Sequence, residues 1–127
     1  MRRLETQIGS VTLKNTLMPA SGCFGFGHEM MERYDLNILG ALVSKSVTKD
    51  LRKGNAGKRI AECEYGLLNS IGLQNPGVES FQKENKGLYN SLKIPKIVNV
   101  AGASEEEYLE VIRQLETLQW VDIYELN

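Results

Sequence analysis

The sequence has few of the residues on which metal centres and disulfide frameworks depend. Its 127 residues include two cysteines, Cys23 and Cys63, and one histidine, His28. The cysteines match no CxxC or zinc-ligand spacing, and a single histidine has no partner for a histidine-based metal site. We therefore expect no metal centre and no disulfide framework.

The chain also has no excess of one charge and no long apolar run. Fifteen basic residues stand against sixteen acidic ones, for a net charge of -1. Nucleic-acid binders gain affinity by neutralising phosphates, so this balance argues against a nucleic-acid partner. No apolar run approaches the roughly 20 residues of a membrane span, and no apolar segment follows the N-terminal arginines as in a signal peptide. These features predict a cytoplasmic globular protein with no membrane partner.

Short apolar runs alternate with stretches of helical periodicity along the chain. A hairpin is expected over residues 4–13, around Gly9-Ser10, and a loop over the polar stretch 49–64. Expected strands are 17–20, 40–43, 96–100 and 121–126, and expected helices are 28–39, 78–92 and 104–118. Ser104 and Glu107 predict a capping box at the start of the last helix. This βαβα order predicts an α/β fold with parallel strands and right-handed crossovers.

A hydrogen-bonding side chain follows each expected strand of the parallel sheet. These residues are Ser21, Lys45, Asn99 and Asn127. The carboxyl ends of parallel strands share one edge, where ligands of α/β folds bind. One lysine, one hydroxyl and two amides there suit a ligand with anionic or carbonyl groups. The alternative is that strands end in polar residues simply because loops are polar.

The glycine-rich stretch SGCFGFG, residues 21–27, has more than one interpretation. Its GxxGxG spacing differs from the dinucleotide fingerprint GxGxxG, so a Rossmann site is disfavoured. The stretch is either a turn leading into a helix or a loop on which a flat aromatic ligand lies against backbone. Cys23 has no basic neighbour to activate it as a nucleophile, which favours a packing role. Lys45 is either a charge anchor or a lysine extending to solvent.

Longer motifs resemble a known family. They are PASGCFGFG at 19–27, LNSIGLQNPG at 68–77, NVAG at 99–102 and ELN at 125–127. With them the chain closely resembles the N-terminal part of dihydroorotate dehydrogenase, above all the bacterial, NAD-linked class 1B, over nearly its whole length. The resemblance implies a TIM (β/α)8 barrel that carries FMN. Residues 1–127 would supply an N-terminal hairpin and about the first four β/α units, as one incomplete domain.

The resemblance also implies an activity and partners. The family oxidises dihydroorotate to orotate in pyrimidine biosynthesis, with a hydride passing to FMN while a base removes a proton from the adjacent carbon. Class 1B implies a homodimer that works with an iron-sulfur, FAD-containing electron-transfer subunit using NAD. The family's catalytic cysteine would lie beyond Asn127. We therefore expect no catalytic residue within this sequence, and no activity from these 127 residues alone.

The resemblance also implies which residues form the site. Those expected to contact FMN are Ala20, Ser21, Gly22, Lys45, Ser46, Asn99 and Asn127. Those expected to contact the substrate are Lys45, Asn69, Ser70, Ile71, Gly72, Leu73 and Asn127. The charge of Lys45 suits both an electron-rich flavin and an anionic substrate, and fixed amides would orient a planar ring.

One stretch departs from the family pattern. The family usually follows the lysine with a small residue, two threonines and a proline-rich loop, whereas here Ser46-Val47-Thr48 precedes a loop without proline. We expect that loop to be more mobile. Two other functions stay open, namely a non-enzymatic half-barrel that self-associates, and an α/β module that binds an anion or a flavin.

Overall fold

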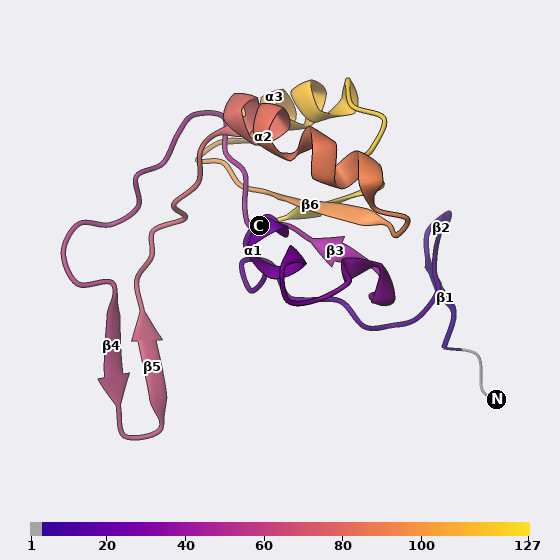
Figure 1. The fold of residues 1–127 in the computed structure, drawn as a ribbon. Coiled ribbons are helices and arrows are strands. Elements are labelled where there is room, and N and C mark those ends of the chain that lie inside the picture. The colour runs from indigo at the N-terminus through magenta and orange to yellow at the C-terminus, as the bar shows by residue number, and fades with distance from the viewer. Residues whose placement is uncertain (1–3) are drawn as a thin grey trace.

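A three-stranded parallel sheet forms the centre of the molecule in the computed structural model, which describes residues 4–127. Its strands are β3 (Leu42–Val43), β6 (Lys96–Val100) and β7 (Ile123–Leu126), in the order β3-β6-β7. Helices α2 (Val78–Ser91) and α3 (Glu105–Glu116) lie on one side of this sheet (Figure 1). Helix α2 connects β3 to β6 and α3 connects β6 to β7, as the βαβα order predicts.

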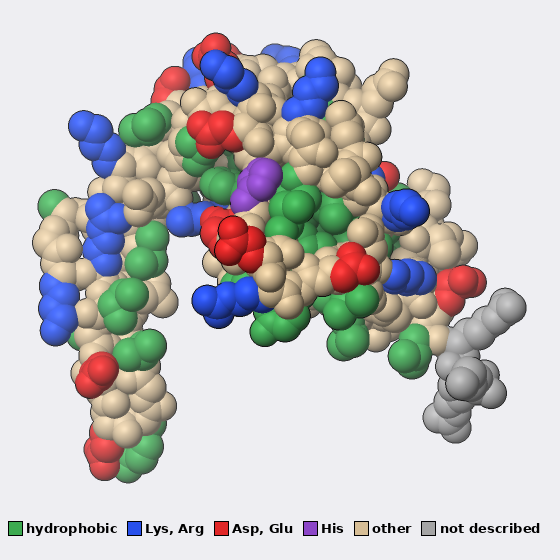
Figure 2. Space-filling view, in the orientation of Figure 1, with side chains coloured by type: hydrophobic (Ala, Val, Ile, Leu, Met, Phe, Trp, Pro, Cys, Tyr) green, Lys and Arg blue, Asp and Glu red, His purple; other side chains and the backbone are tan. Residues whose placement is uncertain are grey.

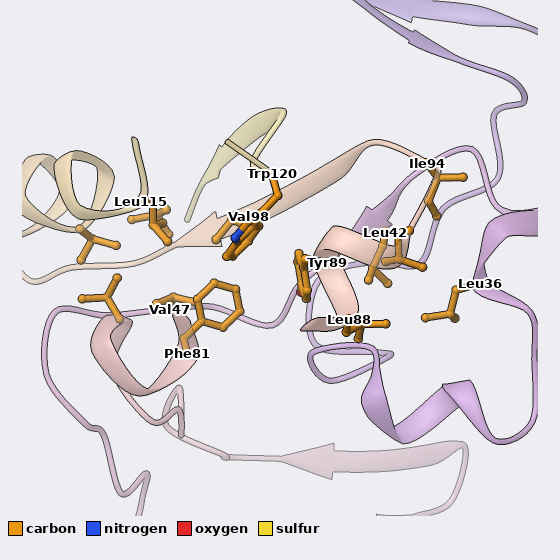
Figure 3. Close-up of a cluster of buried hydrophobic side chains, with 14 residues drawn as sticks. Leu36, Leu42, Val47, Phe81, Leu88, Tyr89, Ile94, Val98, Leu115 and Trp120 are labelled. Carbon is orange, nitrogen blue, oxygen red and sulfur yellow. The ribbon is translucent and has the colours of Figure 1, made fainter. Parts of the chain in front are cut away.

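The main hydrophobic core lies between the sheet and these two helices (Figure 3). Because side chains alternate along a strand, Val98 and Val100 of β6 share one face, and both are fully buried. Three aromatic rings pack in the same cluster, with centroids 4.8 Å apart for Tyr89 and Trp120 and 5.7 Å apart for Phe81 and Tyr89. The apolar face predicted for the helix over 78–92 is the face that supplies Phe81 and Tyr89.

The opposite face of the sheet is apolar at one end and polar at the other. Val43, Ile97 and Leu13 form a second buried cluster near the amino end of β6. Leu13 comes from the N-terminal hairpin of β1 (Thr6–Ile8) and β2 (Val11–Leu13), which confirms the hairpin expected over 4–13. Asn99 stands two residues beyond Ile97 and so shares its face. This change from apolar to polar leaves hydrogen-bonding groups at the carboxyl edge.

A second hairpin projects from the body of the molecule (Figure 1). It consists of β4 (Ile60–Cys63) and β5 (Gly66–Asn69), paired antiparallel. Hydrophobic side chains are visible on it in Figure 2, and Tyr65 at its turn is 92% exposed. The prediction of a loop over 49–64 was therefore wrong at its end. Nearly every side chain of both strands is exposed, so no alternation of buried and exposed residues marked them as strands.

Two other expected elements are wrong or shorter. Residues 17–20 form no strand: Leu17 O accepts a hydrogen bond from Gly40 N at 2.8 Å, but Pro19 has no N–H with which to extend a ladder. The helix expected over 28–39 is instead α1 (His28–Met31) followed by a short 3-10 helix, η1 (Leu36–Ile38). Asp35 separates them, because its extended backbone and its carboxylate, which accepts from Asn37 N, start a new turn.

The start of α3 differs in one contact from the predicted capping box. Ser104 caps the helix by accepting a hydrogen bond from Glu107 N, as expected. The Glu107 carboxylate, however, accepts from Ala103 N at 2.8 Å rather than from the capping residue. The acidic side chain thus reaches one residue further back, where it still satisfies a free backbone donor beside the helix.

Within residues 4–127, no helix is long and apolar enough to span a membrane. Over the same residues, no group of three or more His, Cys, Asp and Glu side chains is placed to hold a metal ion. Cys23 and Cys63 are both exposed free thiols.

Candidate functional site

A cleft of about 480 Å³ lies at the carboxyl edge of the parallel sheet. Four segments of the chain contribute to it: the glycine-rich loop, the residues after β3, the residues at and after the end of β5, and the last residue of the chain. The residues that line it are Ser21, Gly22, Lys45, Ser46, Asn69, Ile71, Leu73 and Asn127. All of them belong to the two sets that the sequence motifs predicted. The structure therefore brings together residues that lie up to about 106 positions apart in the sequence (127 minus 21).

Side-chain hydrogen bonds tie the strand ends together beneath this cleft. Asn127 Nδ2 donates to Ser46 Oγ at 3.0 Å and to Asn99 Oδ1 at 3.4 Å. Asn99 is 2% exposed, and its own Nδ2 donates to Glu125 Oε1. The ends of all three parallel strands are thus linked, so the amide groups at the cleft have fixed orientations.

Lys45 is the only charged residue among those that line the cleft, and its backbone is held from two sides. Its N–H donates to Gly25 O at 2.8 Å, which places the glycine-rich loop against the end of β3. Its carbonyl accepts from Ser44 Oγ, a fully buried hydroxyl that also accepts from Asn99 N at 3.1 Å. The ammonium group therefore extends from a rigid base toward the cleft.

More positive charge lies on the other side of Lys45. A second cleft, of about 610 Å³, shares Lys45 and is also lined by Arg52 and Lys53, with Glu84 as its one acidic residue. Opposite charges attract over several ångströms even near a protein surface. The neighbourhood of Lys45 therefore favours anionic ligands.

Four of the predicted residues lie outside the wall of the cleft. Ala20 is exposed in the turn before Cys23, and Asn99 lies below the surface as described. Ser70 Oγ accepts from Asn55 Nδ2 at 2.7 Å, and a Cβ on Gly72 would meet Asn55. Ser70 and Gly72 therefore face the loop behind the cleft.

Sequence reasoning missed the residues that support the segment 69–73 from this side. Asn55 N donates to Ile71 O at 3.0 Å, so Asn55 braces both Ser70 and Ile71. Arg59 holds the loop itself, because its guanidinium donates to Gln74 Oε1 at 2.6 Å and to Lys53 O at 3.0 Å. The sequence predicted only a loop over 49–64, because most of these hydrogen bonds join residues far apart in the sequence and leave no local pattern.

Comparison with known proteins gives consistent matches. Residues 3–127 match the family model described as dihydroorotate dehydrogenase. The chain is 47% identical to a Listeria welshimeri protein and 45% identical to a Bacillus caldolyticus protein, both named "Dihydroorotate dehydrogenase B (NAD(+)), catalytic subunit". Each match covers 100% of this chain but 42% and 41% of the relative. The chain therefore spans about two fifths of the length of these curated relatives.

A solved structure shows the same fold. The crystal structure of DHODH from Eimeria tenella, in complex with ferulenol, superposes with a TM-score of 0.79 at 14% identity. The match covers 98% of this chain and 36% of that chain. Together with the family match, it confirms the predicted fold class: the sheet, its helices and the N-terminal hairpin are the arrangement of part of a TIM barrel.

Proposed function

Since the chain belongs to the dihydroorotate dehydrogenase family, an oxidoreductase family, we propose that its cleft is one wall of a site for FMN and dihydroorotate. The site would serve the oxidation of dihydroorotate to orotate. The observation that carries this proposal is the convergence of four separate segments on one cleft at the carboxyl edge of the sheet. In TIM barrels the active site lies at that edge.

The lining of the cleft suits FMN. A flavin presents a flat ring with carbonyl oxygens and ring nitrogens, which hydroxyl and amide groups such as those of Ser46 and Asn127 can bind. Gly22 has φ +81°, and a Cβ there would meet no protein atom within 4 Å. The loop therefore presents bare backbone with free space in front of it, as a flat ring lying against it requires.

The residues of this chain would bind and orient rather than transfer the proton. FMN, when bound, supplies the acceptor for the hydride removed from dihydroorotate. Lys45 would neutralise the anionic substrate and bind the electron-rich ring. Asn69 and Asn127 would fix the orientation of the substrate by hydrogen bonds that do not titrate. Ile71 and Leu73 would exclude water from the apolar side of the cleft.

The partners of the protein are part of the proposal. The two bacterial relatives are named catalytic subunits of an NAD(+) enzyme. These names support a protein that works with a second subunit. We assign to that subunit the iron-sulfur cluster and FAD that would pass electrons to NAD, and to this protein a homodimer. Pyrimidine biosynthesis as the pathway and the cytoplasm as the location stay predictions.

The test of this function is flavin binding by the purified protein. FMN is titrated and the quenching of its fluorescence gives a Kd for the wild type and for Lys45→Met. Losing a hydrogen bond to a charged group costs about 1.5–3 kcal/mol, so Lys45→Met should weaken binding about 10- to 150-fold. In a second titration, orotate is added to the FMN-loaded protein, and Lys45→Met should bind orotate more weakly than the wild type does.

Lys49→Met is the matched control. Lys49 pairs with Glu110 at 2.8 Å on the surface, where both side chains are about 40% exposed, and does not line the cleft. Removing such a pair costs at most about 1 kcal/mol of stability, and FMN binding should not change. A wild type that does not quench FMN, or equal effects of the two substitutions, would contradict the proposal. Self-association without flavin binding would favour a non-enzymatic half-barrel.

A further inference from the structure

One wall of the cleft contains a backbone conformation that costs free energy. Leu73 has φ +52°, and within residues 4–127 all other residues with positive φ are glycines. A side chain in this left-handed region collides with its own backbone. Such a conformation persists only where surrounding contacts hold it, and it is concentrated at functional sites. Leu73 lines the cleft, beside Ile71.

The contact that holds Leu73 comes from a buried amide two residues later. Asn75 is 4% exposed, and its Nδ2 donates to Leu73 O at 2.8 Å. Its Oδ1 accepts from Gly77 N at 2.9 Å and from Thr48 N at 3.1 Å. One carboxamide therefore links the strained residue to the start of α2 and to the segment that follows β3.

Asn75 is itself fixed in place. Its backbone N–H and C=O form a pair of hydrogen bonds with Arg52 at 3.0 and 2.9 Å. Its amide also exchanges hydrogen bonds with the hydroxyl of Thr48, which is 4% exposed. Thr48 lies two residues after Ser46, which lines the cleft. The buried pair of Thr48 and Asn75 thus joins the segment that follows β3 to the segment that follows β5.

We propose that Asn75 is a positioning residue, which holds Leu73 in its left-handed conformation so that the segment 69–73 keeps the shape that receives the substrate. This inference rests on the proposed function. It assigns a role to the asparagine of the Asn-Pro-Gly turn, whose side chain does not line the 480 Å³ cleft. The other wall, which carries Ser21, Gly22 and Ser46, does not depend on the Asn75–Leu73 contact. The two ligands should therefore respond differently when that contact is broken.

Asn75→Asp removes the donor to Leu73 O. A carboxylate keeps the oxygen acceptors for Thr48 N and Gly77 N, but it has no N–H to donate to Leu73 O or to Thr48 Oγ1. The Thr48 hydroxyl can still donate to the carboxylate, so the link to Thr48 is kept while the link to Leu73 is lost. In FMN-loaded protein, the Kd for orotate should rise about tenfold, while the Kd for FMN should stay within about twofold. A loss of general stability would instead weaken the binding of both ligands together.

Asn85→Asp is the matched control for a buried charge. Asn85 is 1% exposed and donates from Nδ2 to a backbone carbonyl, that of Phe81, at 2.8 Å, but it lies in α2 away from the cleft. Asn85→Asp should lower the melting temperature of the protein without raising the Kd for orotate. If both substitutions change orotate binding equally, the positioning role is wrong and the proposed function stands. If the wild type binds neither ligand, both fail.

A second pair of variants tests the strain itself and needs no ligand. At a position outside the left-handed region, a glycine variant is less stable than an alanine variant, because glycine loses more backbone freedom on folding. At position 73 the order should reverse, with an unfolding equilibrium constant about fivefold larger for Leu73→Ala than for Leu73→Gly. This difference should shrink in the Asn75→Asp background, where the left-handed conformation is no longer held. Alanine equal to or more stable than glycine would overturn the inference, even if Asn75→Asp fails to fold.

Discussion

Replacing Phe81 by alanine should remove about 3–5 kcal/mol from the free energy of unfolding. The ring is fully buried and lies with its centroid 5.2 Å from that of Phe26 and 5.9 Å from that of Trp120. A whole domain of this kind is stable by only about 5–15 kcal/mol, so the loss should be visible as a large shift of the urea midpoint. Phe26 belongs to the glycine-rich loop. The same substitution should therefore loosen the wall that carries Gly22 and weaken FMN binding.

The assay uses the single tryptophan of the chain as its probe. Trp120 is 5% exposed in the same aromatic cluster, so its fluorescence reports the opening of this core. Tyr65→Ala is the control, since that ring is 92% exposed and its loss should change stability by no more than about 0.5 kcal/mol. Equal midpoints for Phe81→Ala and Tyr65→Ala would refute a core centred on Phe81. If Phe81→Ala is less stable but binds FMN with unchanged affinity, the idea that Phe81 supports the glycine-rich loop through Phe26 is refuted.

Two further outcomes follow from single contacts. Ser104→Ala removes the cap of α3 and should cost about 1 kcal/mol in urea unfolding, whereas no change would mean that Glu107 and its neighbours satisfy the helix end without it. Burial, with a smaller contribution from Glu29, raises the pKa of Tyr89 above its ordinary value of 10.0. The folded protein keeps this proton at a pH where the unfolded chain loses it, so the free energy of unfolding should fall as the pH rises above 10. Tyr89→Phe should lessen that slope, and identical slopes in the two proteins would contradict the assignment.

The parallel sheet and the cleft could be predicted from the sequence because they follow from periodicity and topology. Val98 and Val100 mark one buried face, and parallel strands must share a carboxyl edge, so Lys45, Asn99 and Asn127 were expected to lie close together. Asn127 donates a hydrogen bond to Asn99, and Lys45 and Asn127 line the same cleft, so the structure brings the three residues together. The motifs added the segment 69–73, which no periodicity assigned to the cleft.

The remaining features depend on contacts that leave no local pattern. The second hairpin exposes side chains on both of its faces, so its sequence shows no alternation of apolar and polar residues around Ile60 and Leu67. The polar segment that leads into this hairpin is held in place by Arg59, which donates a hydrogen bond to Gln74, 15 positions away. Apolar spacing over 28–39 suggested a helix, but Met31 and Tyr34 are exposed and Asp35 interrupts the backbone. Asn75 was named only as part of the motif at 68–77, because its side-chain contacts with Thr48 join residues 27 positions apart.

The most direct test of the account is to map FMN on the protein by nuclear magnetic resonance. Backbone amide signals are assigned and followed while FMN is added to the isotope-labelled protein. The largest shifts should occur at residues lining the 480 Å³ cleft, such as Gly22, Lys45 and Ser46, and the exposed face of α3 should be unaffected. Largest shifts at the β4–β5 hairpin or on α3, or no shifts at all, would contradict a flavin site at the carboxyl edge of the sheet.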